Sequence, residues 1–62
     1  MEFKVKERRE KEGMTQEELS KRSGVSRTII SGLESGTIKT TTTKTLLSIA
    51  EALNCKVSDV FL

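Results

Sequence analysis

The chain has 62 residues, of which 34% are hydrophobic and 32% charged, and it contains one Cys and no His, Pro, Trp or Tyr. This length suits a single small domain over residues 1–62, with an economical core, because so short a chain buries only about 60% of its unfolded surface. Without His and with a single Cys, neither a zinc site nor a Ser–His or Cys–His catalytic arrangement can be assembled, so we expect no enzyme, no metal and no cofactor.

Charge and hydropathy restrict the compartment and the partner. Ten of the eleven Lys and Arg residues lie within residues 1–45, beside seven of the nine acids. This excess is a weak indication of an anionic partner such as nucleic acid, although an ordinary solvated surface fits equally well. No apolar run reaches the roughly 18 residues of a membrane span. Cys55 has no partner for an internal disulfide, which fits a reducing compartment, so we expect a cytoplasmic protein. We expect no membrane partner, and no small-molecule ligand is evident.

The first segment, residues 4–12, is rich in helix-forming residues but poor in apolar ones. Val5 is the one apolar residue of this segment, and Phe3 stands just before it. Arg8 and Arg9 therefore have to lay their aliphatic stems along the core if this helix docks.

The segment after Gly13 carries a clear helix-start signal. Thr15 followed by Glu18 is a capping box, in which each side chain satisfies the other residue's free amide. The pattern predicts a helix from about Gln16 to Ser23 that ends at Gly24.

A second capped helix follows almost at once. Ser26 is a good N-cap and Gly36 a good stop, and the apolar residues between them follow helical spacing. Only residues 24–26 separate the two helices, which is too short for a long antiparallel hairpin and favours the sharp crossing of a helix-turn-helix unit.

Residues 37–43 differ in composition, because five of the seven are Thr. Since Thr is a poor helix former, we expect a polar loop in which Thr42 caps the next helix. A lone edge strand is the alternative, but the sequence offers it no partner strand. From Lys44 an amphipathic pattern predicts a helix that ends near Asn54, and Ser58 and Asp59 favour a final helical turn within an apolar tail.

The stretch from Met14 to Gly36, MTQEELSKRSGVSRTIISGLESG, resembles the Cro/lambda-repressor-type helix-turn-helix family of bacterial and phage transcription regulators. Residues 46–54 and 57–61 are similar to the fourth and fifth helices of that family. The resemblance implies an all-α, compact five-helix bundle, a lambda-repressor-like DNA-binding domain. Its recognition helix, about Ser26–Ser35, would enter the major groove.

The resemblance also implies roles for individual residues. It implies that Arg9 and Glu34 form an ion pair between the first and third helices. It further implies a DNA-contacting set of two phosphate contacts, two base readers and three neighbours on the same side: Gln16, Lys39, Arg27, Thr28, Ser26, Ser31 and Gly32. An Arg at the front of a recognition helix can bind the guanine O6 and N7 atoms together, so Arg27 is the expected main reader.

The chain departs from the family pattern at several positions. Ser20 stands where Ala is usual, and its small hydroxyl can bond back to the chain. Gly32 replaces a position that often holds a long polar reader. Thr41 and Thr43 stand where Pro and Leu are common, so we expect a looser loop.

These observations predict a sequence-specific, non-enzymatic regulator of double-stranded DNA, most simply a repressor that occupies a pseudo-palindromic operator. Since one such domain touches few base pairs, we expect a homodimer. Its contact would use the apolar tail, Val57, Val60, Phe61 and Leu62, unless these side chains only complete the monomer core. The alternative function is an antitoxin-like or assembly module that binds another protein.

Overall fold

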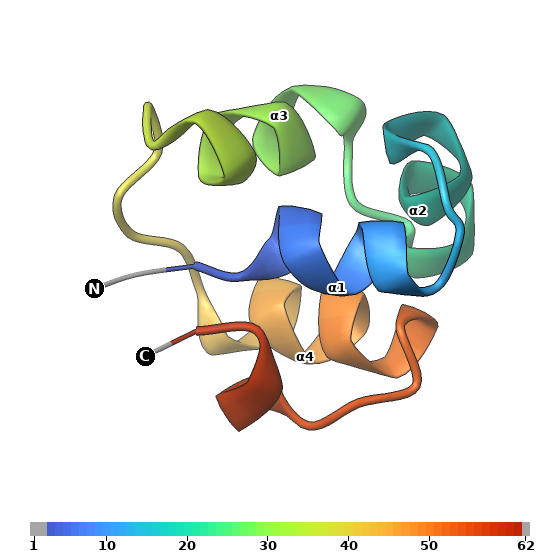
Figure 1. Ribbon diagram of the computed structural model, residues 1–62. Helices are drawn as coiled ribbons and strands as arrows, with labels where there is room; N and C mark the ends of the chain where they lie inside the picture. The colour runs from blue at the N-terminus through green and yellow to red at the C-terminus, as the bar shows by residue number, and fades with distance from the viewer. Residues whose placement is uncertain (1–2, 62) are drawn as a thin grey trace.

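The computed structural model describes residues 3–61, which form four α-helices and one 3-10 turn. The helices are α1 (Val5–Lys11), α2 (Gln16–Ser23), α3 (Arg27–Ser35) and α4 (Thr43–Ala52), followed by the 3-10 turn η1 (Val57–Asp59). In Figure 1, α1 crosses the middle of the view between α3 and α4. Helix α2 packs against α3 and α4, and α1 packs against α3. No helix within the described part of the chain is long and apolar enough to cross a bilayer.

The helices α2, α3 and α4 start where the sequence predicts, each on a side-chain cap. The Thr15 hydroxyl accepts the Glu18 amide at 3.0 Å, and the Thr15 amide donates to Glu18 Oε1 at 3.2 Å. Ser26 and Thr42 likewise accept the amide of the residue three positions on, at 3.3 and 3.1 Å. Each bond satisfies an amide that has no partner inside its own helix.

The helix ends and the Thr-rich loop also follow the prediction. Gly24 and Gly36 close α2 and α3 with φ of 75° and 84°. A residue with a β-carbon adopts this left-handed region only at a cost of about 1–2 kcal/mol. Asn54 follows α4 with φ of 54°. Residues 37–42 form no regular element, which confirms the loop between α3 and α4.

The core is apolar and draws on all four helices, the connections and the C-terminal tail. Its most enclosed side chains, each at most 2% exposed, are Val5, Leu19, Ile30, Leu33, Ile49, Ala50, Leu53 and Val60. No polar or charged residue within residues 3–61 is fully buried. Burial of apolar surface is therefore the main source of stability of the fold.

The prediction of a fifth helix is wrong, because residues 57–59 form a single 3-10 turn. The Lys56 amide donates to Asp59 Oδ2 at 3.0 Å and so starts the turn. Val60 after the turn still has helical backbone angles, and Phe61 then forms an isolated antiparallel bridge with Phe3. A helix that continued through this point could not pair with the N-terminal segment in this way, so the tertiary contact ends it.

The same contact corrects one residue of the expected dimer surface. Val60 has 0% of its surface exposed, and its carbonyl accepts the Lys4 amide at 2.6 Å. It therefore completes the core of the monomer and is not available to a second copy. Val57 and Phe61 are half-buried, and Leu62 lies outside the described residues.

Candidate nucleic-acid interface

The turn between α2 and α3 fixes the angle at which the two helices cross. The Ser20 hydroxyl donates to the Val25 carbonyl at 2.7 Å, as the sequence allowed for a small hydroxyl at this position. The Val25 amide donates to Ser23 Oγ at 3.1 Å, and the Val25 side chain is buried. The three-residue connection is thus held by hydrogen bonds on both sides and by an apolar anchor.

Helix α3 is divided into a buried and an exposed face. Ile30 and Leu33 are 0% and 2% exposed and hold the helix on the core. On the opposite face Arg27, Thr28 and Ser31 are exposed to solvent. The first turn of α3 therefore presents its side chains freely, as a helix must if its N-terminal residues are to reach base edges in a groove.

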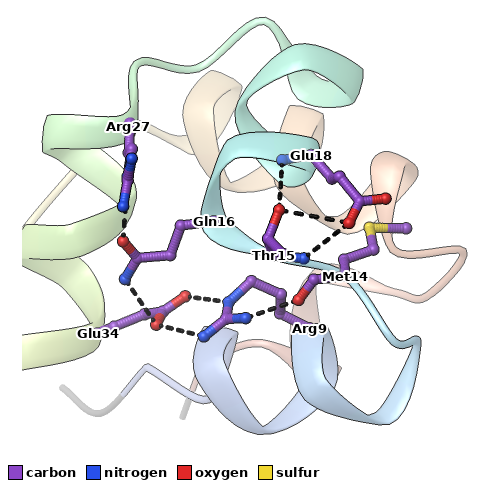
Figure 2. Close-up of polar contacts among 7 residues, drawn as sticks. All are labelled: Arg9, Met14, Thr15, Gln16, Glu18, Arg27 and Glu34. Atoms are coloured by element: carbon purple, nitrogen blue, oxygen red, sulfur yellow. Dashed lines mark hydrogen bonds and ion pairs between the residues drawn. The ribbon is translucent and has the colours of Figure 1, made fainter.

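Behind this surface, Arg9 and Glu34 form the predicted ion pair between α1 and α3 (Figure 2). Arg9 Nε donates to Glu34 Oε2 at 2.8 Å, and Nη2 donates to Oε1 at 3.1 Å. A third bond joins Arg9 Nη1 to the Met14 carbonyl at 2.6 Å. The two side chains are only 12% and 5% exposed, so the pair is geometrically restricted and poorly screened by water.

Gln16, the first residue of α2, extends this pair to the exposed face. Its Nε2 donates to Glu34 Oε1 at 3.1 Å, and its Oε1 accepts a long bond from Arg27 Nε at 3.5 Å. Figure 2 shows the resulting chain of contacts from Arg9 through Glu34 and Gln16 to Arg27. This network links the start of α3 to the start of α2, and no local sequence pattern predicts it.

The network shifts the pKa values of its charged members. Burial by itself raises the pKa of the Glu34 carboxyl, but hydrogen bonds from Arg9 and Gln16 and the nearby positive charge outweigh it. The pKa of Glu34 therefore lies below its ordinary value. The hydrogen bond to Glu34 raises the pKa of Arg9. Both residues are therefore ionised at neutral pH, and their ion pair joins α1 to α3.

Comparison with known proteins agrees with this geometry. The sequence profile of a family described as helix-turn-helix matches residues 5–60. The chain belongs to the Cro/C1-type helix-turn-helix family. A curated relative from Archaeoglobus fulgidus, named as an uncharacterized HTH-type transcriptional regulator, is 44% identical over 62 residues, which are all of this chain and 86% of that protein. The family is one of DNA-binding regulators and not of enzymes.

Within this helix-turn-helix unit, most of the predicted contact residues lie on or beside one surface. Ser26 and the exposed residues of α3 form its centre, and Gln16 is half-buried at its edge. Lys39 is exposed in the loop that follows Gly36. The hydrogen-bonded link between Arg27 and Gln16 brings the expected base reader beside the expected phosphate contact.

Gly32 is the exception: it lies one turn after Thr28 on the same side of α3, but its expected place among the DNA-contacting residues is wrong. Gly32 is buried, because the side chain of Ile38 lies directly over it. An ideal β-carbon at Gly32 would lie 2.5 Å from Ile38 Cδ1. Ile38 was not among the residues expected at this site. A glycine inside a helix is the signal that could have found it, since glycine permits another group to approach the backbone closely.

Proposed function

We propose that this chain is a sequence-specific DNA-binding transcription regulator that inserts α3 into the major groove. The observation that carries the proposal is the bare first turn of α3, where Arg27 and Thr28 are exposed and Arg27 is hydrogen-bonded to Gln16 at the start of α2. A groove-reading helix needs this combination of free N-terminal side chains and a rigid support.

The chemistry of the exposed groups agrees with two kinds of contact. The Arg27 guanidinium can donate two parallel bonds to the O6 and N7 atoms of guanine, a contact worth about 1–3 kcal/mol of discrimination. Gln16 has a second amide N–H beyond the one it gives to Glu34, and together with the amides of the first turn of α2 it can donate to a phosphate. Lys39, exposed in the loop after Gly36, supplies a positive charge for a second phosphate.

Regulation is proposed to be repression by occupancy of an operator in the cytoplasm. A single α3 covers only a few base pairs, so two copies on a pseudo-palindrome, about 34–36 Å apart, give the required specificity. With Val60 in the core, the proposed dimer contact is restricted to the half-buried Val57 and Phe61 and to Leu62.

Selection of bound sequences from a random pool of duplex DNA tests the proposal directly. We expect one short motif with two inverted copies, because the symmetry of the motif reports the symmetry of the bound protein. Arg27→Glu should lower affinity for the selected sequence at least tenfold while leaving the helical circular dichroism spectrum unchanged. Lys56→Glu is the charge control: it introduces the same carboxylate in front of η1 and should bind within about twofold of the parent chain.

Salt dependence separates DNA binding from the protein-interaction alternative. For DNA, the logarithm of the binding constant should fall with the logarithm of salt by about 0.9 for each phosphate neutralised. Absence of an enriched motif, together with equal binding by Arg27→Glu and the parent chain, would refute the proposal and favour a module that binds another protein.

A further inference from the structure

Ile38 takes the place of a side chain that α3 lacks. An ideal β-carbon at Gly32 would lie 2.5 Å from Ile38 Cδ1, 2.6 Å from Cγ1 and 3.3 Å from Cβ. Real β-carbons do not approach other atoms at the two shorter distances, so any residue other than glycine at position 32 would force the Ile38 side chain to shift. The Ile38 side chain occupies the space that the β-carbon of any other residue at position 32 would fill.

This seat is fixed by backbone and side-chain bonds. The Ile38 amide donates to the Gly32 carbonyl at 3.0 Å. At the end of α3, the hydroxyls of Ser35 and Thr37 are 2.9 Å apart and brace the turn around Gly36. A backbone hydrogen bond and the packing of its side chain therefore both tie Ile38 to α3.

The position of the seat relates Ile38 to the surface described above. Gly32 follows Thr28 by four residues, and residues four apart lie on the same side of a helix. Ile38 is half-buried, and the next residue, Lys39, is exposed. Ile38, packed on Gly32, therefore lies on the side of α3 that carries Thr28, one turn further along the helix.

The chemistry of Ile38 restricts what it can read there. Its side chain has no hydrogen-bond donor or acceptor, so it cannot distinguish bases by hydrogen bonds. In the major groove the apolar feature that separates one base from the others is the C5 methyl group of thymine. An aliphatic side chain beside a polar recognition turn therefore favours thymine.

We propose that Ile38, seated on Gly32, is a specificity-determining residue that contacts a thymine methyl group at one position of each half-site. The inference rests on the proposed function, since it requires α3 to lie in the major groove. On this proposal a loop residue, Ile38, contacts a base in place of the long polar side chain that α3 lacks at position 32.

Replacement of thymine by uracil in the selected DNA tests whether Ile38 contacts a thymine methyl group. Uracil lacks the C5 methyl group and keeps the same base pairing, so each thymine of the half-site is replaced in turn and Kd is measured. One position should weaken binding of the parent chain about fourfold, the effect of losing burial of a single methyl group. With Ile38→Ala, the same replacement should have no effect, although overall affinity is lower.

Two further variants assign the contact to Ile38. Lys39→Ala should lower affinity for both DNAs and keep the fourfold uracil effect, because it removes charge and no apolar contact. Thr28→Ser removes the other methyl group on this surface and should also keep it. If the effect persists in Ile38→Ala, or disappears in Thr28→Ser alone, the proposal is wrong.

The fold of the variants and the proposed function are checked separately. Ile38→Val removes Cδ1 and should give an intermediate uracil effect, so it replaces Ile38→Ala if that variant does not fold by circular dichroism. Tight binding of a selected motif with no uracil effect at any thymine would refute the role of Ile38 and leave the proposed function intact. Failure to select a motif would refute the proposed function itself.

Discussion

Breaking the Arg9–Glu34 pair should destabilise the domain more through Arg9 than through Glu34. A 62-residue chain has about 3–9 kcal/mol of stability in total. Glu34→Gln removes the charge from two hydrogen bonds of 2.8 and 3.1 Å, and loss of charge-assisted bonds costs about 1.5–3 kcal/mol. Arg9 in that variant still reaches water through its 12% exposure and still donates to the Met14 carbonyl.

Arg9→Met should destabilise the domain more than Glu34→Gln does. The Glu34 carboxylate is only 5% exposed, and without Arg9 its remaining side-chain donor is Gln16. Removal of one member of a buried pair costs about 3–5 kcal/mol, which we reduce to about 2–4 because this pair is not wholly enclosed. The double variant Arg9→Met/Glu34→Gln has no unpaired charge, so its loss should be smaller than the sum of the single losses by at least about 1.5 kcal/mol.

Urea unfolding followed by far-UV circular dichroism gives the free energies for this cycle. Glu17→Gln is the matched control, because Glu17 meets Lys21 at 3.8 Å on an exposed surface and should contribute less than about 0.5 kcal/mol. Single losses that add to the double loss within about 0.5 kcal/mol would show that the two residues act independently, and the reasoning would fail.

The pH dependence of the same variants gives a second readout. Because the folded pKa of Glu34 lies below its ordinary value, its contribution is complete at neutral pH. It is lost as the pH falls below the ordinary carboxyl range and through the folded pKa. Acidification should therefore reduce the stability difference between the parent chain and Glu34→Gln, and a difference that grows in acid would contradict the sign of this shift.

Three further predictions concern other parts of the fold. Gly32→Ala should lower the free energy of unfolding, measured in urea, by about 1–2 kcal/mol despite the better helix propensity of Ala. Adding Ile38→Ala should restore part of the loss, because the nearest remaining atom, the β-carbon of residue 38, lies 3.3 Å from the new β-carbon. A stabilised Gly32→Ala would refute the close packing. Thr15→Ala should cost about 1 kcal/mol by loss of the α2 cap, seen as a lower urea midpoint with an unchanged slope. Burial raises the pKa of the Cys55 thiol, so at neutral pH it should react with a thiol reagent more slowly in the folded chain than in urea, and equal rates would contradict its burial.

The sequence was most informative where structure depends on near neighbours. The bounds of α2 and α3 follow from the capping residues Thr15 and Ser26 and from the glycines that end each helix, all within a few positions of the elements they define. Such signals need no knowledge of the rest of the chain.

Features that depend on distant contacts were predicted less well. The Arg9–Glu34 pair was available only through the family resemblance, since the two residues are far apart in sequence. The 3-10 turn replaced a helix because Phe61 pairs with Phe3, and Val60 entered the core for the same reason. The burial of Gly32 depends on Ile38, which approaches it from a loop whose path no local pattern specifies.

The pairing of Phe3 with Phe61 places the two ends of the described chain side by side, with their rings 6.4 Å apart. Figure 1 shows this junction at the edge of the molecule, away from the first turn of α3. A short peptide could therefore connect these two ends into a closed ring. Cyclisation would limit the freedom of the unfolded chain and leave the proposed reading surface untouched.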